Sequence, residues 1–155
     1  MTKNRGGQQG MNIINEMKLK IPGKSVNEGF ARSAVAAFAA QLDPTVAEIA
    51  DIKTAVSEAV TNCIVHAYRD TIGTIYIETR VLENRVFMIK IKDRGCGIAD
   101  VKQAMEPLFT TAPGEERAGL GFSVMESFMD KVTVRSTLGK GTVVTLTKKI
   151  GEKGK

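Results

Sequence analysis

Hydrophobic and polar residues alternate near the start of the chain and then follow a helical period. Residues 16–22 (EMKLKIP) have an apolar side chain at every second position and end near a proline, which predicts a half-buried strand. Segments 25–42 and 43–68 repeat apolar residues every three or four positions, so each predicts an amphipathic helix. The first half of the chain is therefore expected to be one strand followed by two helices.

Capping residues indicate where the two helices begin, and the periodicity indicates which side chains they bury. Ser25 and Glu28 have the spacing of a capping box, and Asp43 followed by Pro44 is typical of a helix N-terminus. The expected buried faces are Phe30, Ala34, Phe38 and Leu42 in the first helix, and Val46, Ile49, Ile52, Val56, Val60, Cys63 and Ala67 in the second.

The second half of the chain returns to a period of two and predicts two hairpins. Residues 75–80 and 86–93 alternate on either side of a turn at 83–85. Residues 131–137 and 143–149 form the second predicted pair, around a glycine-rich turn. All four of these strands are thus expected to have antiparallel neighbours.

Between the two hairpins the signals are irregular until a helix at 119–130. A short helix is expected near 99–105, and segment 106–118 shows no periodicity; loops of this length in compact domains are usually functional. Helices and strands come in runs rather than in strict alternation. This order predicts an α+β fold, a two-layer sandwich in which helices pack on one face of a mixed, mostly antiparallel sheet.

The length of 155 residues fits a single domain, which we expect at 12–149 between disordered tails at 1–11 and 150–155. No apolar run is long enough to span a membrane, and the polar N-terminus does not look like a signal peptide. The two cysteines of the chain, Cys63 and Cys96, are therefore expected to be reduced thiols in the cytoplasm.

The net charge of +5 comes from the two ends of the chain. Residues 1–24 carry +4 (five Lys/Arg, one Glu), residues 148–155 carry +3 (four Lys, one Glu), and the rest sums to −2. A groove for nucleic acid would need its basic residues on the folded body. Direct binding to nucleic acid is therefore disfavoured.

Three polar residues interrupt the apolar pattern of the second predicted helix. Glu58, Asn62 and His66 are spaced four residues apart, so they lie along one side of the helix. Such a line is most often a solvent-facing stripe. The helix by itself does not distinguish that interpretation from a binding site.

Three glycine-containing segments farther along have the composition of ligand-binding loops. Asp93 ends a predicted strand, and Gly95 and Gly97 would let a planar ligand approach the backbone. The Gly-Leu-Gly of 119–121 opens a predicted helix, where free backbone N–H groups attract phosphate. The last segment, 139–142 (GKGT), is a tight turn before the final strand. Each segment alone is also consistent with an ordinary turn or hinge.

Together, these four segments resemble the motifs of the Bergerat ATP-binding fold, which is shared by type II topoisomerases, a class of heat-shock chaperones, sensor histidine kinases and mismatch-repair proteins. Residues 58–62 (EAVTN) are similar to its N box, 93–97 (DRGCG) to its first glycine box and 119–121 (GLG) to its second. Within that family, stretches such as IKTAVSEAVTNCIVHAY and ERAGLGFSVMESFMD resemble the small bacterial anti-sigma serine kinases, particularly those of sporulation. The resemblance covers roughly residues 12–148.

This resemblance implies a role for each motif residue. Asn62 would hold Mg²⁺ against the phosphates of ATP, and Glu58 would orient or deprotonate the attacking serine hydroxyl as the catalytic base. Asp93 would bind the amino group of adenine. The other residues expected to bind ATP are His66, Gly95, Gly97, Thr110, Thr111, Arg117, Gly119, Gly121 and Thr142.

The resemblance also implies partner proteins. The expected protein is a cytoplasmic homodimer that inhibits a sporulation sigma factor of the sigma-F type and phosphorylates a serine of an anti-anti-sigma protein. ATP would favour binding of sigma, and ADP would favour binding of the antagonist. Glu28 and Arg32 are candidate sigma contacts, although their i, i+4 spacing also suits an ordinary ion pair within one helix.

Two alternatives stay open at this point. One is a nucleotide-gated module that sequesters sigma without significant kinase activity, and the other is the equivalent anti-sigma kinase of the general stress response. Glu58 favours a catalytic function over the sequestering module, because binding alone would need Asn62 and Asp93 but no base.

Overall fold

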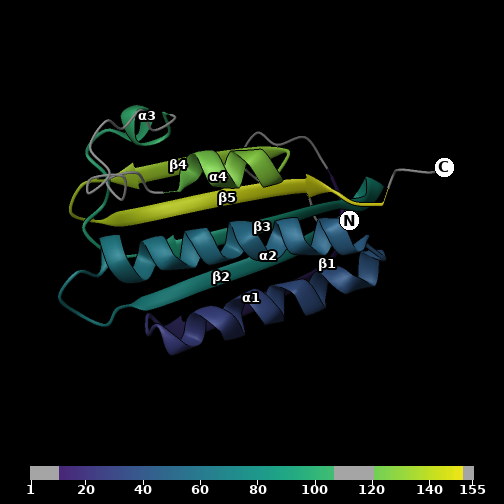
Figure 1. The fold of residues 1–155 in the computed structure, drawn as a ribbon, viewed down its shortest axis with the longest axis horizontal. Coiled ribbons are helices and arrows are strands. Elements are labelled where there is room, and N and C mark those ends of the chain that lie inside the picture. Colours follow the sequence, from purple (N-terminus) through teal and green to yellow (C-terminus); the bar gives the residue numbers. More distant parts are fainter. Residues whose placement is uncertain (1–10, 107–120, 152–155) are drawn as a thin grey trace.

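Five strands form one sheet, and the helices pack on one of its two faces in the computed structural model, which describes residues 11–106 and 121–151 (Figure 1). The order across the sheet is β1-β2-β3-β5-β4, and every neighbouring pair is antiparallel. The strands are β1 (Ile13–Pro22), β2 (Thr74–Leu82), β3 (Val86–Asp93), β4 (Lys131–Thr137) and β5 (Gly141–Lys149). The predicted α+β class and both predicted hairpins are confirmed.

Among the described residues, α1 (Val26–Ala39), α2 (Val46–Thr61) and α4 (Phe122–Phe128) lie over one face of this sheet and α3 (Val101–Ala104) lies near its end (Figure 1). α1 continues into a 3₁₀ turn, and α2 continues into a π-helical turn at Asn62–Ala67. The helices α3 and α4 are short. No helix in the described ranges is long and apolar enough to cross a membrane.

The core lies between the helices and the inward side of the central strands. Ile75 and Ile77 of β2, and Phe87 and Ile89 of β3, are almost completely buried there. They follow the two-residue period of their strands, as the sequence predicts. Burial of each such side chain stabilises the fold by about 1.5–3 kcal/mol.

The predicted capping box at the start of α1 is wrong. Ser25 itself has a helical backbone conformation and its side chain makes no capping hydrogen bond. The Glu28 carboxylate instead accepts a hydrogen bond of 2.7 Å from the hydroxyl of Ser57 on α2. The Glu28 carboxylate therefore bonds to a hydroxyl on the neighbouring helix and not to the backbone at the start of its own helix.

The buried face of α1 agrees with the prediction only in part: Leu42, just after the helix, is buried and Phe38 packs against the core, as predicted. Phe30 is 54% exposed, whereas the buried side chains are the small ones of Ala31, Val35, Ala36 and Ala39. Small side chains let the backbones of α1 and α2 approach closely, so they occupy the contact in place of the phenylalanine.

α2 begins later than Asp43-Pro44. Asp43 has a left-handed backbone conformation (φ 48°), and Thr45 is the N-cap. Thr45 Oγ1 accepts from the Glu48 N–H at 3.1 Å, while Glu48 Oε1 accepts from the Thr45 N–H at 2.9 Å. Thr45 and Glu48 thus form a reciprocal capping box, the motif predicted for Ser25 and Glu28 at the start of α1. Val46, predicted to be buried, is exposed as a consequence of this later start.

The folded body extends past the predicted boundary at residue 149. Ile150 is fully buried, and its N–H donates to the Arg85 carbonyl oxygen at 2.9 Å. The Gly151 N–H donates to Glu48 Oε2 at 3.1 Å. Of the tails expected at 1–11 and 150–155, residues 1–10 and 152–155 lie outside the described residues.

Candidate functional site

A cleft of ≈ 610 Å³ opens between the C-terminal end of α2 and the ends of β3 and β5. Asn62, Cys63 and His66 line it from the π-helical turn that follows α2, Asp93 lines it from β3, and Thr142 lines it from β5. The remaining lining residues are Ala59, Ala67, Arg69, Cys96, Gly97, Ile98, Ala99, Asp100, Gln103, Ala104, Phe122 and Val144. The cleft thus gathers candidate residues from three separate segments of the sequence.

Asp93 supplies a buried carboxylate to this cleft, with only 5% of the residue exposed. Its Oδ1 accepts from the Gly95 N–H at 2.9 Å, and its Oδ2 accepts from the Cys63 thiol at 3.6 Å. Burial raises the pKa of Asp93, while hydrogen bonds from Gly95, Cys63 and the Thr142 backbone act in the opposite direction. The result is a fixed hydrogen-bond acceptor that suits a donor such as an exocyclic amino group.

Cys63 has a role that its place in the apolar stripe did not reveal. Burial raises the pKa of its thiol well above the ordinary value, and the negative charge of Asp93 adds to this shift. The thiol therefore stays protonated and donates to the carboxylate. Sequence reasoning identified Cys63 as a core residue, but nothing in the sequence paired it with Asp93.

Ser136 of β4 supports the Asp93 end of the cleft through contacts with β5, although it was absent from the predicted site. Its Oγ donates to the Gly141 carbonyl oxygen at 3.0 Å and accepts from the Ile98 N–H at 2.7 Å. Thr142 Oγ1 lies 2.8 Å from the same oxygen and is left to act as the donor. The strand register that pairs Ser136 with Thr142 creates this contact.

Gly95 allows a close approach between the strand end and α2. A Cβ atom there would collide with the carbonyl group of Ala67, whose oxygen accepts a hydrogen bond of 3.1 Å from the Cys96 N–H. Gly97 follows on the wall of the cleft. The first glycine-containing segment therefore packs against the end of α2 and leaves the ligand side open.

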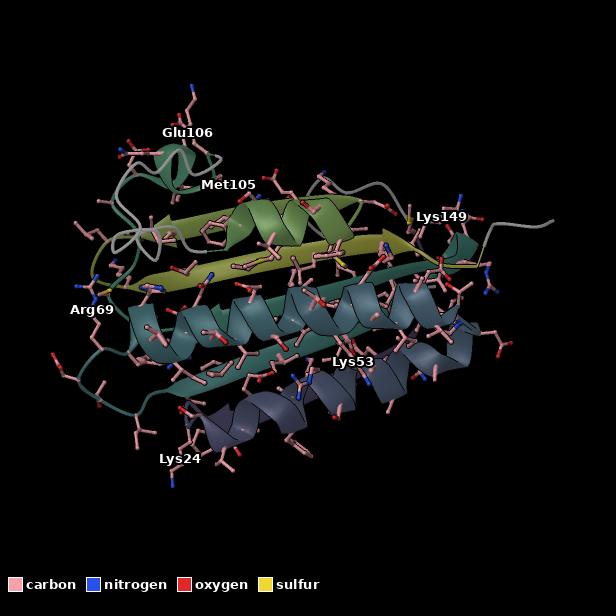
Figure 2. All side chains as sticks on the ribbon, in the orientation of Figure 1. Lys24, Lys53, Arg69, Met105, Glu106 and Lys149 are labelled. Carbon is pink, nitrogen blue, oxygen red and sulfur yellow. The ribbon has the colours of Figure 1, made fainter. Side chains whose placement is uncertain are left out.

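Asn62 and His66 come from the end of α2, where the helix widens into a π-helical turn. Such turns are frequent at functional sites because they re-aim side chains. Burial lowers the pKa of His66, and the nearby charge of Arg69, which stands at this end of α2 in Figure 2, lowers it further. The imidazole is therefore neutral near pH 7.

Glu58 lies one turn before Asn62 and faces the start of α4 rather than the cleft wall. Its carboxylate abuts Gly121, the N-cap of α4, which has a left-handed conformation with φ 70°. A Cβ atom at Gly121 would collide with that carboxylate. The structure therefore brings together two predicted residues, Glu58 and Gly121, that are 63 positions apart in the sequence.

The other predicted residues do not all contribute to this geometry. Thr110, Thr111, Arg117 and Gly119 lie outside the described residues. Glu28 and Arg32 belong to α1 and do not line the cleft. They form the expected intrahelical ion pair at 3.4 Å, and Arg32 Nη1 also lies 3.4 Å from Ser57 Oγ.

The donor set fits a nucleotide that brings its own magnesium ion. In the described part of the chain, no group of three His, Cys, Asp or Glu side chains could hold a metal. Mg²⁺ bound to nucleotide phosphates needs only one or two protein oxygens, and the Asn62 amide on the cleft wall can supply one. Asp93 and the adjoining glycines suit the base at the other end.

Comparison with known sequences gives the same picture. Residues 24–148 match the histidine kinase-like ATPase domain. The chain is 62% identical over 141 residues to the anti-sigma F factor of Caldanaerobacter subterraneus subsp. tengcongensis, covering 91% of this chain and 98% of the relative. It is 54% identical over 137 residues to the anti-sigma F factor of Pasteuria penetrans, covering 88% of this chain and 91% of the relative.

Solved structures share the fold at low identity. A crystal structure of RsbU and RsbW domains from Mycobacterium tuberculosis matches 88% of this chain and 32% of that chain, with a TM-score of 0.65 and 18% identity. The catalytic domain of the histidine kinase ThkA matches 88% of this chain and 97% of that domain, with a TM-score of 0.51 and 15% identity. At these identities the likeness concerns the fold alone.

Proposed function

The chain belongs to the histidine kinase-like ATPase family and, within it, to the anti-sigma F factors, and on this basis we propose that it binds Mg-ATP in the cleft. Anti-sigma F factors are ATP-dependent serine kinases. We assign the bound partner as a sigma factor of the F type and the substrate as a serine of an anti-anti-sigma protein.

One observation supports this assignment above the others. A single cleft joins a buried acceptor, Asp93, to the polar end of α2, where Asn62 and His66 stand. Asp93 would accept a hydrogen bond from the amino group of adenine, and Thr142, held by Ser136, would support that contact. The triphosphate would then extend toward Asn62.

Asn62 would hold Mg²⁺ through its amide oxygen, without adding charge. The magnesium ion, when bound with ATP, would offset the charge of the phosphates during transfer of the γ-phosphoryl group. His66 would donate a hydrogen bond to a phosphate oxygen from its neutral ring. Gly121 would present its backbone N–H at the start of α4, and Gly119, Thr110, Thr111 and Arg117 would complete the phosphate-binding segment.

Glu58 would act as the catalytic base. Its carboxylate would accept the proton of the substrate serine as the hydroxyl oxygen bonds to the γ-phosphorus and the bond to the β-phosphate oxygen breaks. The products would be phosphoserine and ADP. Gly121 leaves room for this carboxylate, because any larger side chain there would displace it.

We place sigma docking on α1 of a cytoplasmic homodimer, with ATP favouring sigma and ADP favouring the antagonist. Arg32 keeps much of its side chain exposed, while Glu28 is held by Arg32 and by Ser57. Arg32 is therefore the better candidate for a direct contact. Arg32→Glu should weaken sigma binding at least tenfold in a titration, and unchanged binding would remove α1 from the docking surface.

The test of catalysis is transfer of labelled γ-phosphate to an anti-anti-sigma protein. Glu58→Gln keeps the shape of the side chain but removes the base, so transfer should fall about 10²–10⁴-fold while ATP affinity changes little. Glu126→Gln, on the exposed side of α4, is the matched control and should transfer normally. If the wild-type protein binds ATP but labels no partner, the chain is a nucleotide-gated sequestering module instead.

A further inference from the structure

The end of β3 presents opposite chemistry to the two faces of the sheet. Asp93 points into the cleft on the helix side, and the strand alternation turns its neighbours Lys92 and Arg94 to the other face. Both side chains are exposed. The end of β3 therefore contributes Asp93 to the cleft and two cations, Lys92 and Arg94, to the opposite face of the sheet.

Pairing of the strands extends this charge across the sheet. The registers place Lys20, Tyr76, Lys92, Val143 and Arg135 side by side, one from each strand. Two adjoining hollows of ≈ 570 and ≈ 400 Å³ lie on this face and share Lys92 and Val143. We use the name basic face for the cations that line these two hollows, with the exception of Lys18. They are Lys20, Lys90, Lys92, Arg94, Arg135 and Lys140.

The charge of the basic face is not neutralised within the described ranges. None of its six cations forms an ion pair with a carboxylate there. Two carboxylate residues also line the hollows. Glu78, in the first hollow, pairs with Lys18 at 3.7 Å and with Arg80 at 3.5 Å. Asp93 borders the second hollow, but its carboxylate accepts from Gly95 and Cys63 on the cleft side. Like charges gathered in hollows attract anions, because a bound anion relieves their mutual repulsion.

We propose that the basic face binds an acidic segment of a partner protein. This proposal goes beyond the nucleotide cleft and does not depend on whether the chain transfers phosphate. Guanidinium and ammonium groups suit carboxylates, and the two hollows could receive successive acidic side chains. An extended segment crossing the strands would meet Lys20, Lys92 and Arg135 in turn.

Tyr76 favours a protein segment over single-stranded nucleic acid. Nucleic-acid platforms use free aromatic faces on which bases stack. Tyr76 is the one aromatic residue lining these two hollows in the described part of the chain, and two cations cover it. The Arg94 guanidinium carbon lies 5.0 Å from the ring centroid and Lys20 Nζ lies 5.7 Å from it.

Other occupants match the charge less well. A second copy of the chain seated with the same face against this one would oppose cation to cation. The tails do not supply carboxylates, since residues 1–10 contain none and residues 152–155 contain one glutamate beside two lysines. The complementary partner is thus another protein with an acidic stretch.

The test uses the full chain and a fluorescein-labelled deca-glutamate peptide at low salt. We expect saturable binding that weakens as salt increases, because screening shortens the reach of the charges. Lys92→Glu/Arg135→Glu should weaken binding at least tenfold. The control, Lys24→Glu/Lys53→Glu, makes the same change of charge at two exposed lysines, one just before α1 and one on α2 (Figure 2), and should stay within twofold.

Both variants should bind ATP as the wild type does, which shows that they are folded. The proposal is wrong if the wild type does not bind the peptide, if the two double variants lose binding equally, or if Lys92→Glu/Arg135→Glu retains it. Tighter binding of a decamer of deoxythymidine than of deca-glutamate would also overturn it, in favour of nucleic acid. Loss of phosphoryl transfer with retained peptide binding would affect only the kinase assignment.

Discussion

The two ends of the cleft are built in different ways. At the Asp93 end, both carboxylate oxygens and the hydroxyl of Thr142 already have partners, supplied by Gly95, Cys63 and Ser136. At the other end, Asn62 lines the cleft, and Glu58 lies one turn earlier on the same helix and faces the start of α4. Within the described residues, the Glu58 carboxylate lies in close contact with Gly121 at the start of α4.

This difference indicates that the two ends should contribute separately to ATP affinity and to the rate of phosphoryl transfer. A preorganised acceptor binds a rigid group such as a purine base with little loss of entropy, so the Asp93 end should determine affinity. The Glu58 end needs only correct placement of one carboxylate at the moment of transfer, so it should determine rate. Changes at the two ends should therefore separate binding from catalysis.

Apart from substitution of Glu58 itself, Gly121→Ala should have the largest effect, and the effect should be on the rate of transfer. The new methyl group would push the Glu58 carboxylate aside, and displacement of a catalytic group by about 1 Å can cost roughly 100-fold in rate. ATP affinity should change by no more than about threefold, because the Asp93 end is untouched. Single-turnover transfer and nucleotide titration measure the two quantities separately.

Gly139→Ala is the matched control for this experiment. Gly139 also has a left-handed conformation, with φ 81°, but an added Cβ atom would meet nothing within 4 Å. It should show only the strain of that conformation, about 1 kcal/mol in the free energy of unfolding. Equal losses of transfer in both variants would show that backbone strain, and not the collision with Glu58, is responsible.

Asp93→Asn should have the next largest effect, and on affinity. Loss of a hydrogen bond to a charged acceptor is worth about 1.5–3 kcal/mol, so ATP should bind roughly 10–100-fold more weakly. Calorimetric titration measures this loss, with the exposed Asp70→Asn as control. Unchanged affinity would show that the preorganised end does not hold the base.

The same substitution should change how stability depends on pH. Because burial raises the pKa of Asp93 in the folded state, the wild type loses free energy of unfolding as pH rises through that raised pKa. Asp93→Asn removes this loss, so its free energy of unfolding relative to wild type should increase toward neutral pH. Urea unfolding at roughly pH 4 and pH 8 compares the two proteins.

The sequence predicted the layers of the fold because their signals are local. The change from a period of 3.6 to a period of 2 after Tyr68 is visible without any knowledge of neighbours. The predicted capping box of α1 and part of its predicted buried face were wrong because they depend on α2. Ser57 donates to the carboxylate of Glu28, and the contact between the helices buries Ala31 and Val35 instead of Phe30. Neither partner can be read from the segment itself.

The site divides in a similar way. Asn62, Asp93 and Thr142 were predictable because each belongs to a motif, and the structure places all three on one cleft. Ser136 was not predictable, since its contact with Thr142 exists only through the register of β4 against β5. Motifs therefore indicate which residues line the cleft, whereas the residues that hold them in place depend on packing between distant segments.

Ser136→Ala should have a smaller effect, at the Asp93 end. It would leave the Ile98 N–H and the Thr142 hydroxyl without their shared partner, which should cost about 1 kcal/mol of unfolding free energy and a few-fold in ATP affinity. The transfer rate at saturating ATP should not change. Ser127→Ala, on the exposed side of α4, is the control, and a reduced rate in Ser136→Ala would contradict the division between the two ends.

His66 should show the smallest effect and tests the phosphate end directly. Burial lowers its pKa in the folded protein, so its contribution to stability is present at neutral pH and is lost as pH falls through that lowered value. A phosphate oxygen beside the ring would favour the charged form and raise this pKa when ATP binds. NMR titration of the single histidine of the chain, with and without Mg-ATP, measures the change.

We expect the pKa of His66 to rise in the complex, and His66→Ala to weaken ATP binding by about threefold, the equivalent of one ordinary hydrogen bond. Binding of adenosine, which lacks phosphates, should not move the pKa, because the Asp93 end alone would be occupied. A pKa that is the same in free and ATP-bound protein would place His66 outside the phosphate contacts and leave Asn62 as the residue through which this part of α2 meets the nucleotide.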